Sequence, residues 1–524
     1  MMATTTEIER KFVAPDGFAL PDLTAIPGVA SVDDPVELNL DATYYDTMSL
    51  ALARHRMTLR RRRGGHDAGW HLKRPAGGDR TELQLPATTR SRKVPDELIA
   101  EVWAVSRGDE FVPIARIRNR RMERAVRDNR GAVLALMSDD SVASESYEAA
   151  GGEPTSRQWH ELEAELVDGS REFLATLSDA LVAAGARAAE SPSKLAQALG
   201  DRYPVANGAL PDGDPRWAAT PGPSSSWSGR TVRAYLGQHR DELVANDPLV
   251  RAGDPDGVHD MRVAIRRLRA TLRTFRSMLD PSRTEPLRAE LQWLGGLLGA
   301  VRDGDVMRRR LDKALAAEPP DTIVGPVATR IHERLGTSTG QARDALAAAM
   351  TSQRYAHVLD ELDAVVDSDL THATGDRLRR AARKAVRRAD ARLDAALELP
   401  DEPTGVAFPS SVPRSRDAAL HDARKAYKRA RYAAEALAPE AGASARRLAK
   451  RLRILQDILG EHQDSIVAAQ LLRDYGMRAH LDGDNAFSYG MLYARQTAAG
   501  ARELDDLDRA RRRSRRRGVR AWLD

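Results

Sequence analysis

The hydrophobic pattern of this 524-residue chain changes at one stretch, Pro204–Gly229, which reads PVANGALPDGDPRWAATPGPSSSWSG. Before it, short segments alternate polar and apolar residues, as β-strands do; after it, long segments repeat with a period near 3.6, as helices do. The stretch is rich in Pro, Gly and Ser and has no period, which predicts a linker. We therefore expect an α+β protein with a β-rich domain at 1–203, a linker at 204–229 and an all-α region at 230–524.

Composition excludes several classes of site. The chain has no cysteine, which rules out disulfide frameworks, cysteine-ligated metals and thiol catalysis. The net charge of +5 combines an acidic part before the linker with a basic part after it, which predicts two different tasks. No apolar run reaches the roughly 18 residues of a membrane helix, and the N-terminus has no secretory signal pattern. We expect a cytoplasmic protein.

Charged residues alternate along several strands predicted in the first domain. EIERKF (Glu7–Phe12) and HELEAEL (His160–Leu166) each carry acidic side chains on one face, and LRRRR (Leu59–Arg63) and HLKRP (His71–Pro75) carry basic ones. One interpretation is a solvated sheet face with cross-strand ion pairs. The combination of acidic and basic strands favours a closed barrel with a polar interior, which a divalent cation and a phosphate chain would fill.

These segments, with YYDT (Tyr44–Thr47) between them, resemble in their order the CYTH superfamily, the triphosphate tunnel metalloenzymes, over about residues 4–200. The resemblance implies an eight-stranded antiparallel β-barrel tunnel with flanking helices that acts on triphosphate compounds. It assigns metal binding by Mg²⁺ or Mn²⁺ to Glu7, Glu9, Asp140, Glu161 and Glu163, and catalysis to Lys11, Glu161 and Glu163. It assigns substrate binding to Arg60, Arg62, Lys73, Arg118, Arg120 and Lys194. Arg121 is a rival to the Arg118 and Arg120 register, and Asp139 to Asp140.

The second region contains a duplicated pair of motifs. VHDMRVAIRRLR (Val258–Arg269) matches LHDARKAYKRAR (Leu420–Arg431), and LLGAVRDGD (Leu297–Asp305) matches ILGEHQDS (Ile458–Ser465). The spacing from His259 to Asp303 nearly equals that from His421 to Asp464, which indicates duplication. We expect two pseudo-symmetric four-helix bundles, with the Pro-rich stretch Leu399–Pro413 between them.

Each copy carries a basic stripe at helical spacing. The stripe residues are His259, Arg262, Arg266, Arg269, Arg273, His421, Arg424, Lys425, Lys428 and Arg431. Two such stripes facing each other would attract a long polyanion. Because few aromatic residues are interleaved for stacking on bases, a phosphate chain fits better than nucleic acid. The histidines suit hydrogen bonding to phosphate better than metal binding, because neither has a second ligand at helical spacing.

These motifs resemble the CHAD domain, the conserved histidine α-helical domain, over about residues 226–515. The resemblance implies helical bundles around a basic cavity that binds inorganic polyphosphate. We therefore expect a metal-dependent triphosphatase that hydrolyses inorganic triphosphate to diphosphate and phosphate and binds polyphosphate, with association with polyphosphate granules. Two alternatives stay open: a non-catalytic polyphosphate-binding protein, and nucleotide chemistry, for which the sequence offers no evident base pocket. The oligomeric state is not predicted.

Overall fold

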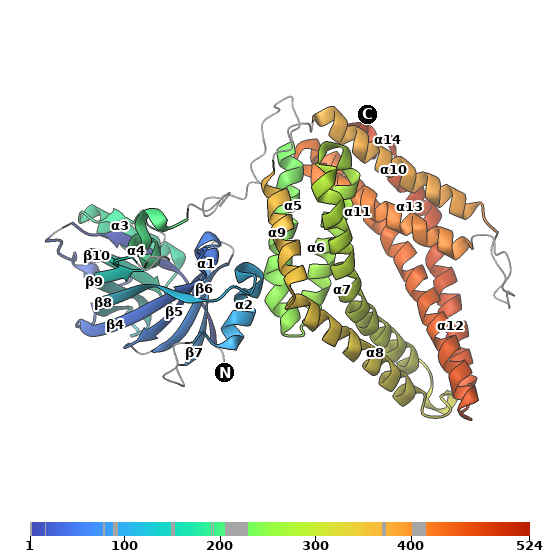
Figure 1. Ribbon diagram of the computed structural model, residues 1–524, viewed down its shortest axis with the longest axis horizontal. Helices are drawn as coiled ribbons and strands as arrows, with labels where there is room; N and C mark the ends of the chain where they lie inside the picture. Colours follow the sequence, from blue (N-terminus) through green and yellow to red (C-terminus); the bar gives the residue numbers. More distant parts are fainter. Residues whose placement is uncertain are drawn as a thin grey trace. The chain divides into compact units, whose positions relative to one another are not determined.

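The structure, a computed structural model, describes residues 3–15, 17–65, 67–76, 79–86, 93–147, 152–189, 191, 193–204, 229–368, 374–400 and 415–524. The chain divides into two compact units, 1–216 and 217–524, each described here by itself. An antiparallel β domain is followed by an all-helical region, which confirms the predicted fold class (Figure 1). The predicted linker and the Pro-rich stretch fall almost entirely outside the described residues, so the predicted domain boundaries stay predictions.

The first unit is built on one sheet with short helices around it. Its strands are β1 (Ala3–Glu7), β2 (Glu9–Val13), β3 (Ser31–Val32), β4 (Val36–Asp46), β5 (Thr58–Arg63), β6 (Gly69–Ala76), β7 (Asp79–Pro86), β8 (Val112–Arg127), β9 (Val133–Ser146), β10 (Thr155–Leu166) and β11 (Arg187–Ala188). Its α-helices are α1 (Ala51–Arg54), α2 (Asp96–Ser106), α3 (Arg171–Ala183) and α4 (Lys194–Leu199).

The N-terminal segment closes the sheet into a ring. The strand order is β1-β7-β6-β5-β4-β8-β9-β10-β2-β11, with β3 beside β8, and every pairing is antiparallel. Only Ile8 separates β1, which pairs with β7, from β2, which pairs with β10. Counted as one interrupted strand, β1 and β2 complete an eight-membered ring with β4 to β10, and the two-residue strands β3 and β11 are additions.

Apolar residues on the outside of the ring anchor α3. Leu162 and Ala164 of β10 face outward and pack with Leu174, Leu177 and Leu181 of α3, all fully buried or nearly so. Ser170 caps α3 by accepting a hydrogen bond from the Phe173 amide, as its position before the helix favours. Because side chains of a strand alternate, this apolar outer face leaves the glutamates of β10 to the interior.

The helical unit repeats its order of helices. The first half contains α5 (Gly229–Arg251), α6 (Pro255–Thr274), α7 (Pro281–Ala316), α8 (Val327–Met350) and α9 (Gln353–Asp367). The second half contains α10 (Gly375–Leu397), α11 (Arg416–Leu481), α12 (Phe487–Glu503) and α13 (Leu507–Ser514), with the short α14 (Arg517–Arg520) after it. None of the described helices is long and apolar enough to cross a membrane.

A break at Gly442 divides α11 into two segments, which correspond to two separate helices of the first half. Gly442 has φ 71° and ψ −151° inside α11, a conformation that glycine adopts without steric cost, and it breaks the helix in two. The part of α11 before Gly442 matches α6, and the part after it matches the long helix α7. The ends of the two long hairpins, α7–α8 and α11–α12, pack together around Leu311, Ile331, Leu472 and Leu492 (Figure 1).

Candidate functional site

Buried carboxylates line one part of the ring interior. Glu161 and Glu163 of β10 are 4% and 8% exposed, and Asp140 of β9 lies directly opposite Glu161 in the strand register. Asp140, Glu161 and Glu163 each offer an oxygen atom, and these atoms all lie within 4.8 Å of one another. Carboxylate oxygens at this separation are the donor set that hard divalent cations such as Mg²⁺ and Mn²⁺ prefer, so the residues fit a metal ion.

Three cationic side chains neutralise this acidic cluster. Lys194, the first residue of α4, places its Nζ 2.9 Å from Asp140 Oδ2, 2.5 Å from Glu161 Oε1 and 2.8 Å from Glu163 Oε1. Lys11 Nζ of β2 lies 2.8 Å from Glu163 Oε1. The guanidinium of Arg121, on β8, donates two hydrogen bonds of 2.8 Å to the two oxygens of Asp140 and also pairs with Glu163. We call Asp140, Glu161 and Glu163 the acidic cluster, and Lys11, Arg121 and Lys194 its three cations.

The cations keep Asp140 and Glu163 ionised despite their burial. Burial alone would raise the pKa of Glu163, but Lys11, Lys194 and Arg121 outweigh it and hold that pKa well below the usual range. The pKa of Asp140 is lowered in the same way, since Lys194 and Arg121 outweigh burial. Burial would lower the pKa of Lys194, and the three carboxylates raise it instead. Asp140, Glu163 and Lys194 are therefore charged at neutral pH.

Basic side chains from β5 and β6 share the interior with this cluster. Around the buried carboxylate of Glu82, on β7, the Nη2 atom of Arg60 lies at 3.7 Å and Nζ of Lys73 at 3.9 Å. His71 Nδ1 lies 2.9 Å from the same oxygen. Burial lowers the pKa of His71 to about 4, helped by Arg60, so this histidine is neutral, and its Nε2 lies 2.8 Å from the carbonyl oxygen of Asp67.

Two further groups mark this part of the interior as electropositive. Burial and the nearby Arg60 lower the pKa of Arg62 to about 10, although Arg62 also pairs with Asp67. Burial would raise the pKa of the Tyr44 hydroxyl, but Arg60, Lys194 and Lys73 lower it, and Arg60 Nη1 donates to that hydroxyl at 3.4 Å. An excess of positive charge in a buried space is suited to an anion.

The N-terminal acidic pair is only partly described. Glu9 Oε1 lies 3.3 Å from Lys11 Nζ, and Glu9 is paired in the strand register with Glu165. Burial raises the pKa of Glu165, and Glu9 adds to this because like charges repel. The side chain of Glu7 lies outside the described residues, although its backbone pairs with Arg80 in β1 and β7.

In each half of the helical unit, one arginine side chain packs over a glycine of another helical segment. Arg262 of α6 lies over Gly299 of α7 and donates to Asp303 Oδ1 at 2.8 Å. Its counterpart Arg424 lies over Gly460, where an added Cβ would come within 3.0 Å of the guanidinium. A glycine at this position leaves room for a guanidinium to lie flat against the next helix. The predicted duplication therefore appears at the level of single contacts.

The two basic stripes approach each other between α6 and α11. Lys428 of α11 lies among Arg424 of its own helix and Arg262 and Arg266 of α6, and burial together with these cations lowers its pKa to about 7. Within the described part of the chain, Arg266 Nε and His421 Nδ1 are buried and have no hydrogen-bond partner. Unpartnered buried donors among like charges are costly unless a ligand satisfies them.

Further along α6 the same surface continues. Burial and the neighbouring Arg288 lower the pKa values of Arg269 and Arg273. Burial and Arg273 lower the pKa of Arg429 on α11 to about 10, and Arg388 and Arg392 of α10 contribute. α6 rises about 1.5 Å per residue, so the stripe from His259 to Arg273 extends over roughly 20 Å. We use the name basic groove for the basic side chains of α6, α10 and α11 together, namely His259, Arg262, Arg266, Arg269, Arg273, Arg388, Arg392, His421, Arg424, Lys428 and Arg429.

Comparison with known proteins agrees with both units. The pattern of the CYTH domain matches residues 5–197, and that of the CHAD domain matches residues 234–473. An uncharacterized protein from Mycobacterium tuberculosis (strain CDC 1551 / Oshkosh) is 35% identical over 521 residues, 97% of this chain and 96% of the relative. The chain belongs to the family that joins a CYTH domain to a CHAD domain.

Solved structures are similar to parts of the chain. PptA from Streptomyces chartreusis is 25% identical and covers 54% of this chain and 98% of its own, with a TM-score of 0.46. The CHAD domain from the plant Ricinus communis is 26% identical and covers 54% of this chain and 90% of its own, with a TM-score of 0.41.

The structure corrects one predicted register in the CYTH domain. Arg118 and Arg120 do not join the interior: the Arg118 side chain is 54% exposed and lies 3.4 Å from Glu145, and Arg120 is exposed. Arg121 joins the acidic cluster in their place, because neighbouring residues of β8 face opposite sides of the sheet. Asp140, the residue assigned from the sequence to the metal site, faces inward. Its rival Asp139 pairs with His160 on the other face.

Besides Arg262, two residues of the CHAD stripes are paired with acids. Arg431 Nε lies 3.0 Å from Glu435 Oε1, and its side chain is 11% exposed. Lys425 Nζ lies 2.9 Å from Asp422 Oδ1, and its side chain is half exposed. An acidic partner therefore offsets the charge of Arg431 and of Lys425.

Glu82 and His71 were missed as interior residues of the CYTH domain. The signal was present: in TELQL (Thr81–Leu85), Glu82 and Gln84 alternate with leucines, as the glutamates of β10 do. His71 is two residues from Lys73 on one strand and so shares its face.

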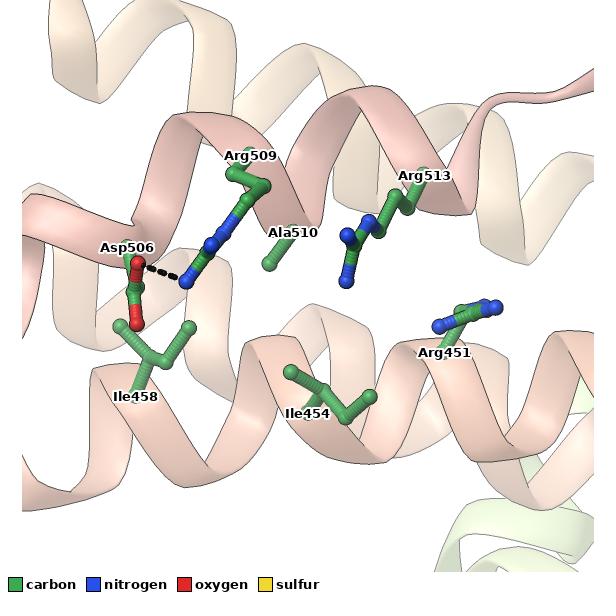
Figure 2. Close-up of a pocket in the computed structure, with 7 residues that line it drawn as sticks. All are labelled: Arg451, Ile454, Ile458, Asp506, Arg509, Ala510 and Arg513. Atoms are coloured by element: carbon green, nitrogen blue, oxygen red, sulfur yellow. Dashed lines mark hydrogen bonds and ion pairs between the residues drawn. The ribbon is translucent and has the colours of Figure 1, made fainter.

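A small hollow lies elsewhere in the CHAD domain. It measures about 180 Å³ between α11 and α13, and none of the predicted site residues lines it (Figure 2). Ile454 and Ile458 form its floor, and Arg451 and Arg513 stand at one end.

Proposed function

We propose that the CYTH domain is a metal-dependent triphosphatase that hydrolyses inorganic triphosphate to diphosphate and phosphate. The observation that carries the proposal is the division of one buried interior into a carboxylate part and a cationic part. A phosphate chain requires cations along its length, whereas the carboxylates suit a metal ion beside the phosphorus under attack.

The residues of the interior divide the work by their chemistry. Arg60, Arg62 and Lys73 bind phosphate oxygens and hold the chain in place. Lys11 neutralises the charge that develops on the phosphoryl group in transfer, which is the main requirement of this reaction. Arg121 takes the place of Arg118 and Arg120 among the residues that bind the phosphate chain.

Hydrolysis also requires an oriented water molecule. Glu161 or Glu163 accepts a hydrogen bond from that water, whose oxygen attacks the terminal phosphorus in line. The bond from phosphorus to the bridging oxygen breaks, diphosphate leaves, and the proton of the water passes to the carboxylate and then to solvent. Mg²⁺ or Mn²⁺, held by Asp140, Glu161, Glu163 and the Glu7–Glu9 pair, would polarise the phosphate oxygens.

We further propose that the basic groove of the CHAD domain binds inorganic polyphosphate. The support is the row of His259, Arg262, Arg266, Arg269, Arg273, His421, Arg424 and Lys428, in which few acids intervene. Counterion release from a long polyanion would drive binding. Such binding in the cytoplasm would bring the enzyme to polyphosphate granules.

The test is phosphate release from triphosphate, long polyphosphate, ATP and thiamine triphosphate, with Mg²⁺ or Mn²⁺. Glu9→Ala should lower triphosphate turnover at least ~100-fold, because it removes a carboxylate from the metal pair. Arg118→Ala, on the exposed face, is the matched control and should retain turnover. Equal, metal-independent rates in wild type and Glu9→Ala would reject hydrolysis and leave the alternative of a non-catalytic polyphosphate-binding protein.

A further inference from the structure

Lys194 contacts the same three carboxylates that suit a metal ion. Its Nζ lies within 2.9 Å of one oxygen from each of Asp140, Glu161 and Glu163. An ammonium and a divalent cation cannot both lie at these oxygens, because each would repel the other at short range. The lysine and the metal ion therefore compete for one position.

The three carboxylates already have cationic partners without a metal ion. Three carboxylates face Lys194, Lys11 and Arg121, and the ion pairs among them are close. A divalent cation at these oxygens would have to displace the Lys194 ammonium, which would then lie in a buried space without its three carboxylate partners, and this is unfavourable. A phosphate chain brings the negative charge that makes the displacement favourable.

The cationic part of the interior begins close to Lys194. Tyr44, to whose hydroxyl Arg60 donates, packs in the same buried cluster as Leu195, the residue after Lys194. The backbone of Lys194 is fixed, because α4 buries Leu195, Ala198 and Leu199 against Ile117 and Val142 of the interior. Only the flexible side chain needs to turn from the carboxylates to a phosphate oxygen.

We propose that the Lys194 ammonium holds the position of the divalent cation until a phosphate chain enters, so that metal ion and phosphate bind together. This inference rests on the proposed function of the CYTH domain. By linkage, the factor by which phosphate tightens metal binding equals the factor by which metal tightens phosphate binding. Lys194 is in this view a positioning residue that couples the two ligands.

The experiment measures Mn²⁺ affinity by calorimetry, with and without imidodiphosphate, a phosphate chain that resists hydrolysis. Wild type should bind Mn²⁺ at least ~10-fold more tightly when imidodiphosphate is present. Lys194→Met keeps the length of the side chain without its charge. It should bind Mn²⁺ alone at least ~10-fold more tightly than wild type and gain less than ~3-fold from imidodiphosphate. Lys93→Met, at an exposed lysine of the same domain, should behave as wild type.

Thermal melting gives a second readout that does not depend on turnover. Metal-free Lys194→Met should melt below wild type, because three carboxylates lose a buried partner, and Mn²⁺ alone should raise its melting temperature more than that of wild type. Lys194→Arg keeps a cation and should keep the coupling, so it tests the idea if the methionine variant does not fold.

The outcomes separate this inference from the proposed function. If wild type hydrolyses triphosphate but binds Mn²⁺ equally with and without imidodiphosphate, the coupling is refuted and the enzymatic proposal stands. Unchanged Mn²⁺ affinity in Lys194→Met also overturns the role of Lys194. If no Mn²⁺ binds under any condition and no hydrolysis occurs, both proposals fail.

Discussion

Lys428 gives the basic groove a property that surface lysines lack. Burial, followed by Arg424, Arg266 and Arg262, lowers its pKa from 10.5 to about 7, and Asp464 opposes this only in part. A polyphosphate chain in the groove would replace repulsion by attraction and return this pKa toward its ordinary value. We therefore predict that polyphosphate binding takes up a proton at Lys428.

The size and sign of the effect follow from these values. At pH 8, a group with a pKa of 7 is protonated in about one molecule in ten, so binding should take up ~0.9 proton. Because the pKa of Lys428 is low in the free protein and high in the complex, the contribution of Lys428 to affinity should be constant below pH 7. It should fall as pH rises above 7, by up to about tenfold per pH unit. At pH 8 the groove histidines His259 and His421, whose pKa values burial lowers, stay neutral in the free protein.

The assay is calorimetry at pH 8 in Tris and in HEPES, which differ in ionisation enthalpy, so proton uptake appears as a difference in heat. Lys428→Arg is the matched variant, because an arginine keeps the charge and does not titrate in this range. It should bind polyphosphate with no difference between the buffers. Equal heats for wild type in the two buffers, or an undiminished difference in Lys428→Arg, would refute the reasoning.

Three further predictions test other parts of the chain. Arg121→Ala should reduce triphosphate turnover at least ~100-fold and lower the melting temperature, because Asp140 and Glu163 lose a buried partner. Arg120→Ala should keep the turnover and the melting temperature of wild type. Equal effects of the two substitutions would contradict the corrected register. Arg266→Ala combined with Lys428→Ala should weaken polyphosphate binding and flatten its dependence on salt, measured by titration at several salt concentrations; an unchanged slope would count against the groove. Leu177→Ala should lower the free energy of unfolding by about 2–5 kcal/mol in denaturant titration, because Leu177 is fully buried between α3 and the sheet; a loss below ~1 kcal/mol would show that this contact is not a core contact.

The sequence by itself determined the two fold classes and the faces of many strands. Period two on HELEAEL assigns Glu161 and Glu163 to one face and Leu162 to the other, because successive side chains of a strand must alternate. The duplicated motifs likewise determined that Arg262 and Arg424 are equivalent. These results depend only on local geometry, which a single sequence contains.

Only the tertiary structure decided which face of β8 points inward and what meets in the interior. In ARIRNRR (Ala115–Arg121), the face of Arg118 and Arg120 is wholly basic, whereas Arg121 shares its face with Ala115 and Ile117. A polar interior therefore favours Arg118 and Arg120 from the pattern alone, and only the pairing of Arg121 with Asp140 across β9 shows that the other face points inward. Lys194 reaches the carboxylates because α4 packs against the interior, a contact between segments distant in the chain. Register and such packing depend on partner elements, and for that reason the local pattern cannot contain them.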